Sequence, residues 1–267
     1  MPPSFLPPRL VQTTGPRLRL EVYLGLVTVA GVLVLTLMDY TEGWTRVTAH
    51  PFLFVFFVAC ALLGELFPIK FPGKEDEVTT STCFLYAVLI AFGLAPAVIA
   101  QVAISVVADV LQRKSPLSIG FNAGQLTITF AATGWVLGAL SDLPHSGLEV
   151  PLTVGDMPAI VAAGVVFFAL NNLLAGIAWA ISSNTPIMAL LRDDLGFQAW
   201  TTFLLLGFAP IIIAVSAYGL FLLPLLVLPV LAIHRSSHEA RLSEYRSLHD
   251  RLTDLPNRVL FHDRAQR

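Results

Sequence analysis

The stretch Met157–Ile181, MPAIVAAGVVFFALNNLLAGIAWAI, carries no charged side chain. A helix that crosses a bilayer takes about 20 mostly apolar residues, so this stretch has the length of a membrane span. Three further stretches are similarly long and mostly apolar: Val22–Met38, Pro51–Phe67, which contains the single charged residue Glu65, and Ile119–Leu140. The whole chain agrees with them, because 55% of its residues are hydrophobic and only 13% are charged, against about 25% charged in a soluble domain. The sequence therefore predicts an all-α, polytopic transmembrane bundle.

Two other apolar runs, Val78–Leu111 and Gln198–Ile233, are too long for one span, and a breaker interrupts each near its middle. The first contains Gly93-Leu94-Ala95-Pro96 and the second Tyr218-Gly219. Gly tolerates positive φ and Pro lacks an N–H, so both residue types interrupt helices. Each run is either one kinked helix or a tight hairpin of two short helices.

The basic residues favour hairpins, because Lys and Arg concentrate in cytoplasmic loops. Two hairpins give eight spans, with both termini and every one of the 16 basic residues except Arg46 on one side. Two single helices give six spans and move Arg113, Lys114 and Arg192 to the side of Arg46. We therefore expect about eight spans, with six as the alternative and both termini in the cytoplasm. The halves of the first hairpin are short, at roughly 22 Å of helix each.

The character of the chain changes after the last apolar run. Residues 234–248 are polar and rich in helix formers, which predicts a cytoplasmic linker helix that also pairs two chains as a homodimer. The segment Asp250–Arg258, DRLTDLPNR, follows it; Pro256 predicts a turn, and Asn257 can cap a helix beginning at Arg258. The expected division is a tail at 1–20, a membrane domain at 21–233, the linker at 234–248 and a distinct segment at 249–267.

That last segment resembles the opening of a GGDEF domain, the diguanylate cyclase family, whose first signature is D-x-L-T-G-L-x-N-R. The matching positions are Asp250, Leu252, Thr253, Leu255, Asn257 and Arg258. Asp254 replaces the family's Gly, which puts the geometry of the turn in doubt. The continuation through Leu260-Phe261 is similar to the form common in tandem GGDEF–EAL proteins.

The resemblance implies that an output domain condenses two GTP into cyclic di-GMP with Mg²⁺. The 267 residues contain no Gly-Gly pair and hence no GG[D/E]EF loop. We therefore expect this chain to hold no catalytic residue, metal ligand or cofactor, with GTP and Mg²⁺ belonging to an output domain that is cut off here. More loosely, Ala97–Leu140 resembles the membrane-associated sensor (MASE-type) domains found before cyclic di-GMP enzymes.

Polar side chains inside a membrane are functional candidates. Asn122 and Gln125 share a face of one predicted helix, Asn171 and Asn172 lie in another, and Gln101 lies in the first long run. They form interhelical hydrogen bonds, a ligand pocket or an ion pathway. Interface ion pairs are expected between Glu65 and Lys70 and, at i, i+4, between Asp109 and Arg113. Small residues that would let helices approach closely are Gly120, Gly124, Gly134 and Gly138.

The leading hypothesis is a membrane-embedded sensor or anchor of the bacterial cytoplasmic membrane that regulates a GGDEF output. A small-molecule transporter and a purely structural anchor are the alternatives. The lipid bilayer is the expected partner; the net charge of −2 is segregated along the chain and gives no indication of nucleic-acid binding.

Overall fold

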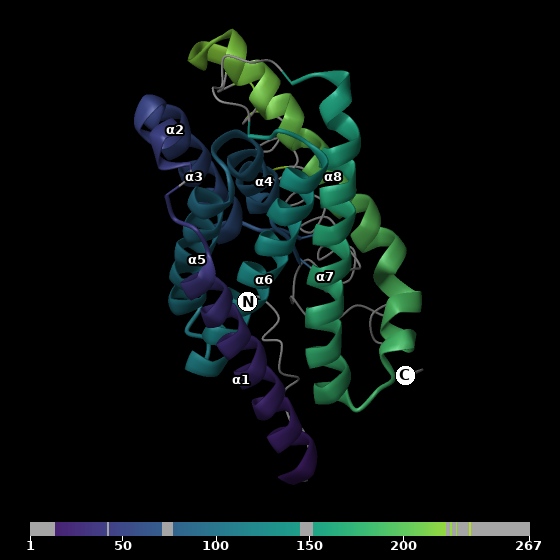
Figure 1. Ribbon diagram of the computed structural model, residues 1–267. Helices are drawn as coiled ribbons and strands as arrows, with labels where there is room; N and C mark the ends of the chain where they lie inside the picture. Colours follow the sequence, from purple (N-terminus) through teal and green to yellow (C-terminus); the bar gives the residue numbers. More distant parts are fainter. Residues whose placement is uncertain are drawn as a thin grey trace, which may run out of the picture.

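The computed structural model describes residues 14–41, 43–70, 77–144 and 152–222, with single positions at 225, 228 and 235. Eight α-helices make up this part of the chain, which confirms the all-α prediction (Figure 1). A strand pair of two residues each, β1 (Ile69–Lys70) against β2 (Glu77–Val78), was not predicted. The helices are α1 (Thr14–Leu37), α2 (Trp44–Ala49), α3 (Pro51–Leu66), α4 (Ser81–Phe92), α5 (Leu94–Leu111), α6 (Pro116–Leu140), α7 (Met157–Ser183) and α8 (Ile187–Tyr218).

Among the described residues, five helices are long and apolar enough to cross a membrane, and the chain is a polytopic membrane protein on that ground. The shorter helices α3 and α4 are apolar, but their 16 and 12 residues correspond to about 24 Å and 18 Å of helix, less than a hydrocarbon core of about 30 Å. The structure thus supports five long spans rather than the full count of eight. The five spans are Arg17–Leu37, Leu94–Leu111, Pro116–Leu140, Val154–Ser183 and Leu195–Tyr218.

Helices α3 and α4 run in opposite directions. Gly64 near the end of α3 lies against Thr80 and Ser81 at the start of α4, while Phe54 near the start of α3 meets Phe92 at the end of α4. The same reversal relates α5 to α6, α6 to α7 and α7 to α8, as the contacts between their residues show. The start of α1 and the turn between α5 and α6 therefore lie toward one end of the bundle, and α2 lies at the other (Figure 1).

The first long run is a hairpin, as the basic residues indicated. Helix α4 ends at Phe92 and α5 begins at Leu94, with only Gly93 between them. Gly93 has φ +98° and ψ −177°, a conformation open to glycine because it has no Cβ. Pro96 falls in the first turn of α5, where a missing N–H costs no hydrogen bond. The two breakers therefore act together, one making the reversal and the other starting the next helix.

The second long run breaks where the sequence indicated, because α8 ends at Tyr218 and Gly219 follows with φ +144°. The helix begins earlier than predicted, at Ile187 rather than Gln198, so Arg192 lies within α8 and not in a loop. Most of the predicted second half of this hairpin and of the linker at 234–248, and all of the segment at 249–267, lie outside the described residues; a short 3-10 helix, Leu220–Leu222, follows Gly219.

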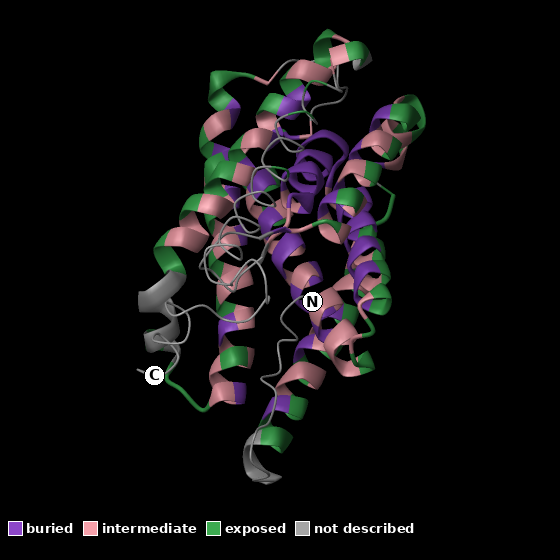
Figure 2. Ribbon diagram, turned by 180° about the vertical axis from the view of Figure 1, so that it is seen from behind, coloured by how far each residue is buried: buried purple, intermediate pink, exposed green. Residues whose placement is uncertain are grey.

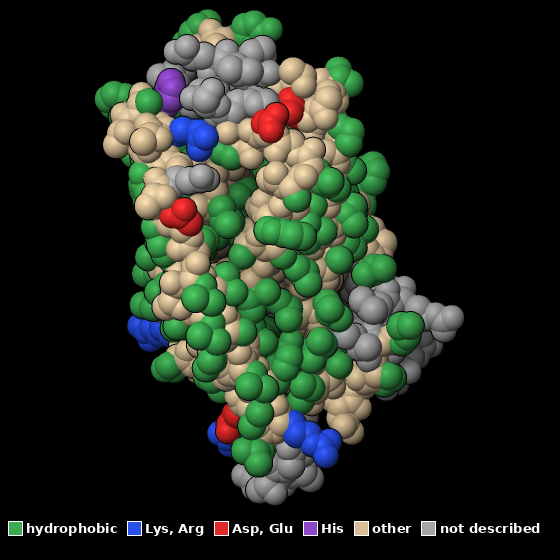
Figure 3. Space-filling model, viewed as in Figure 1, with side chains coloured by type: hydrophobic (Ala, Val, Ile, Leu, Met, Phe, Trp, Pro, Cys, Tyr) green, Lys and Arg blue, Asp and Glu red, His purple; other side chains and the backbone are tan. Residues whose placement is uncertain are grey.

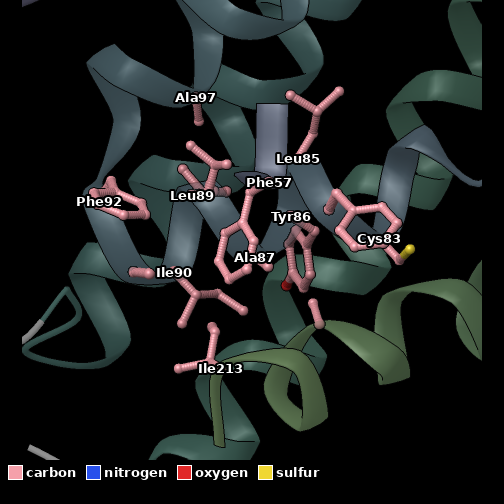
Figure 4. Packing of buried hydrophobic residues seen from close by; sticks show 14 of the residues in the cluster. Phe57, Cys83, Leu85, Tyr86, Ala87, Leu89, Ile90, Phe92, Ala97 and Ile213 are labelled. Carbon is pink, nitrogen blue, oxygen red and sulfur yellow. The ribbon is translucent and has the colours of Figure 1, made fainter. Parts of the chain in front are cut away.

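The core surrounds α4. Nearly every residue of this helix is buried, and burial is concentrated there in Figure 2. Phe57, Tyr86 and Phe92 are fully buried, and the Phe57 and Phe92 rings meet edge to face. Figure 4 shows these side chains together with Leu89, and shows Ile90 approaching Ile213 of α8. The Tyr86 hydroxyl donates to the Ile160 carbonyl of α7 at 2.6 Å, so the one polar atom of this cluster is satisfied.

The outer surface has the opposite character. Large apolar side chains of α1, α6 and α8 are exposed, among them Leu26, Trp135 and Trp200. Apolar atoms cover the middle of the molecule in Figure 3, and charged side chains gather toward its ends. A surface of this kind suits hydrocarbon and not water.

Candidate functional site

Charged and amide side chains contact one another at the turn between α5 and α6. Arg113 adopts a left-handed conformation with φ +56°. The Arg113 N–H bonds to the Val110 carbonyl and the Lys114 N–H to the Asp109 carbonyl, both at 3.0 Å. This is a Schellman motif, in which the left-handed residue reverses the chain and satisfies the last carbonyls of a helix.

Asp109 is only 4% exposed, and both of its carboxylate oxygens have partners. Lys114 Nζ lies 2.6 Å from Oδ1, and the amide of Asn122 on α6 donates to Oδ2 at 2.7 Å. An ion pair that also accepts an amide hydrogen bond can be held out of water, because the buried charge is compensated. Asp109 thus fixes the end of α5 to the first half of α6.

The predicted pair of Asp109 with Arg113 is not formed. An i, i+4 pair requires the helix to continue through the second residue, whereas α5 ends at Leu111 and Arg113 is left-handed. The reversal turns Arg113 outward, where it is exposed, and brings Lys114 back to the carboxylate. The sequence pattern therefore indicated Asp109 as the acid of a pair but did not indicate Lys114 as its partner.

Gln125, the second amide residue of α6, bonds to the helix on the other side, α7. Gln125 Nε2 donates to the side-chain oxygen of Asn171 on α7 at 2.9 Å and to its backbone oxygen at 3.1 Å. Asn172 is not part of this contact, since its amide donates to the Phe168 carbonyl of its own helix at 2.8 Å. Helix α6 is thus tied to α5 by Asn122 and to α7 by Gln125. We call Asp109, Lys114, Asn122, Gln125 and Asn171 the polar network.

The remaining polar candidates lie apart from this network. Gln101 is buried on α5, 5% exposed, and makes no hydrogen bond to either amide of α6. Glu65 accepts a hydrogen bond of 2.5 Å from the Ser81 hydroxyl at the start of α4. The side chain of Lys70 lies outside the described residues, so the predicted Glu65–Lys70 pair is untested, as are the GGDEF-like positions Asp250, Leu252, Thr253, Leu255, Asn257 and Arg258.

The small residues of α6 do not all face the same neighbouring helix. Gly120 lies against Thr28 of α1, and Gly124 lies against Val27 and Thr28. Gly134 instead faces Leu94 and Leu89, while Gly138 has nothing near it. The closest approach joins Gly124 to Gly31 of α1, where an added Cβ would lie 2.3 Å from the Gly124 Cα. Helix α1 therefore packs directly beside the polar network.

The chemistry of the network is electrostatic and mechanical. Within residues 14–41, 43–70, 77–144 and 152–222, no three His, Cys, Asp or Glu side chains are grouped so that they could hold a metal ion. The network can hold the charge of Asp109 inside the bundle, because Lys114 compensates it. Its hydrogen bonds also depend on the positions of α5 and α7 relative to α6. Comparisons with known proteins give no further information, since no family model, curated protein or solved structure matches the chain.

Proposed function

We propose that residues 21–233 are the membrane-embedded sensory or anchoring region of a cyclic di-GMP signalling protein whose output is a GGDEF domain. One observation carries the proposal, namely the run from Asp250 to Arg258, which matches the opening signature of that family and follows the last apolar run and a polar linker. The output domain supplies GTP and Mg²⁺ binding, and this chain supplies its membrane attachment and control.

The proposed orientation places one end of the bundle in the cytoplasm. Arg17 and Arg19 lie at the start of α1, and Arg113 and Lys114 lie in the α5–α6 turn toward the same end. Arg46 lies at the opposite end, where its guanidinium donates to the Pro144 carbonyl at 3.1 Å. We call the first group the basic end, and cytoplasmic loops favour basic residues. Helices α3 and α4 then act as short spans in a locally thinned bilayer, which preserves eight passes.

In this proposal, a movement of α6 relative to its neighbours transmits the signal. A stimulus in the bilayer that moves α6 against α5 or α7 must break the Asp109–Asn122 or the Gln125–Asn171 contact. Two discrete pairings of such groups provide the bistable element that a switch needs. The shift passes through α7 and α8 to the linker at 234–248, which holds two output domains together as a homodimer.

The test is the conversion of GTP to cyclic di-GMP by membranes that contain the protein with the residues its reading frame encodes after Arg267. The proposal expects a GG[D/E]EF loop within one domain length and Mg²⁺-dependent product formation, and none from the chain that ends at Arg267. A reading frame without that loop contradicts the signalling assignment and leaves the transporter as the better hypothesis. If the reading frame encodes the loop but the protein forms no cyclic di-GMP, the cyclase output is contradicted and a regulatory GTP-binding role is left.

A further inference from the structure

Helix α5 carries a line of polar side chains along its inner face. Gln101, Ser105, Asp109 and Gln112 are spaced at i, i+4, i+8 and i+11, so they lie within one narrow sector of the helix. Gln101 and Ser105 are each 5% exposed, and Asp109 is 4% exposed. We call these four residues the α5 polar stripe.

The opposite face of α5 meets the lipid. Its exposed side chains include Ile99 at 37%, Val107 at 44% and Val110 at 56%. These positions are all apolar and lie about half a turn from the stripe. The helix is therefore amphipathic in the sense opposite to a soluble helix, with its polar side turned into the bundle.

Three members of the stripe, Gln101, Ser105 and Gln112, make no side-chain hydrogen bond to another described residue. Within the part of the chain that the structure describes, the Gln112 Oε1 atom is the one side-chain polar atom that is fully enclosed without a partner. The Gln101 amide and the Ser105 hydroxyl make no hydrogen bond to a described residue either, but their polar atoms are not fully enclosed. By contrast Gln125, equally buried at 6%, donates to Asn171. A buried polar atom without a partner destabilises the fold, so a partner that this chain does not supply is favoured at Gln112 Oε1.

We infer that the α5 polar stripe binds a file of water molecules that enters the bundle from the basic end. Water suits the stripe because each molecule both donates and accepts, as do the Gln101 amide and Ser105 hydroxyl, and buried waters serve otherwise unsatisfied groups. The Asp109–Lys114 pair stands at the entrance, and at helical rise Gln101 lies about 12 Å further in. The file gives the carboxylate of Asp109 contact with the aqueous phase from within the bundle.

Water-edited solid-state NMR of the chain in lipid bilayers, with ¹⁵N in the glutamine side chains, tests this inference. The method reports how fast magnetisation passes from mobile water to each amide. Gln125 is the matched control, because it has the same side chain and burial but a protein partner. The inference expects severalfold faster transfer to Gln101 than to Gln125, and equal rates at the two amides would overturn it.

A second experiment, with a variant at Ser105, tests whether the water enters from the basic end. Ser105→Val replaces the middle hydroxyl and is expected to slow transfer to Gln101 severalfold while leaving Gln112 unchanged. Thr127→Val on α6 is the control, because the Thr127 hydroxyl is satisfied by the Ala123 carbonyl at 2.8 Å. An unchanged rate at Gln101 in Ser105→Val would overturn entry from the basic end. If the variant does not fold, the transfer rates at Gln101 and Gln112 are compared in the unaltered chain. Faster transfer from water to Gln101 than to Gln112 would equally overturn entry from the basic end.

Discussion

Asp109 on α5 and Lys114 in the turn after it form an ion pair with 2.6 Å between Nζ and Oδ1, five positions apart in the sequence. The pair exists because the left-handed Arg113 between them reverses the chain. One backbone conformation thus selects which of two neighbouring cations meets the buried acid, and it joins the end of α5 to the network on α6.

Removal of the lysine should destabilise the bundle. In Lys114→Met, Asp109 keeps only the Asn122 amide, and a buried charge that loses its partner costs about 3 kcal/mol. Arg113→Met is the matched control and should be close to neutral, since Arg113 is exposed. Thermal unfolding in nanodiscs measures both, and Asp109→Asn combined with Lys114→Met should recover most of the loss. A Lys114→Met variant as stable as the control would contradict the assigned partner.

Replacement of Arg113 by glycine should stabilise the protein against thermal unfolding. The φ of +56° at Arg113 strains a residue with a Cβ, and Arg113→Gly removes that strain, worth about 1 kcal/mol. Arg113→Ala removes the same charge but keeps the strain, so it isolates the backbone effect. We expect the glycine variant to have the higher midpoint of thermal unfolding of the two. The reverse order would mean that the α5 terminus is not left-handed.

The approach of α1 to α6 predicts a pair of contrasting glycine variants. Gly31→Ala places a methyl group 2.3 Å from the Gly124 Cα, which forces the two helices apart. Overpacking of this kind costs about 1–3 kcal/mol. Gly25→Ala on the same helix meets nothing within 4 Å and should not destabilise. Equal thermal midpoints for these two variants would exclude the close crossing.

Part of this architecture could be predicted from residue patterns and part could not. The break at Gly93 was predictable, because glycine and a nearby proline interrupt an apolar run that is too long for one span. The start of α8 was not, because Arg192 and its acidic neighbours end the apolar pattern while the helix continues through them. Hydropathy locates what lies in the membrane, and a helix that projects beyond it gives no such signal.

The polar network shows a similar division. The spacing of Asn122 and Gln125 predicted that two amides share one face of α6, and in the structure each bonds to a different neighbouring helix. Asn171 and Asn172 differ by about 100° in direction, so only one can reach α6, and the helix rotation that selects Asn171 is set by tertiary packing. The partner of Asp109 depends on one left-handed residue, for which arginine gives no sequence signal.

The most direct test of the signalling account compares Asn171→Ala with Asn172→Ala in the protein that includes its proposed output domain. Both remove an amide from the same turn of α7, but only Asn171 bonds to α6, while Asn172 bonds to its own helix. The rate of cyclic di-GMP formation is measured at matched protein abundance in membranes. The account predicts a severalfold change in that rate for Asn171→Ala and none for Asn172→Ala. Equal rates for the two variants would contradict the role of the α6–α7 contact in control of the output.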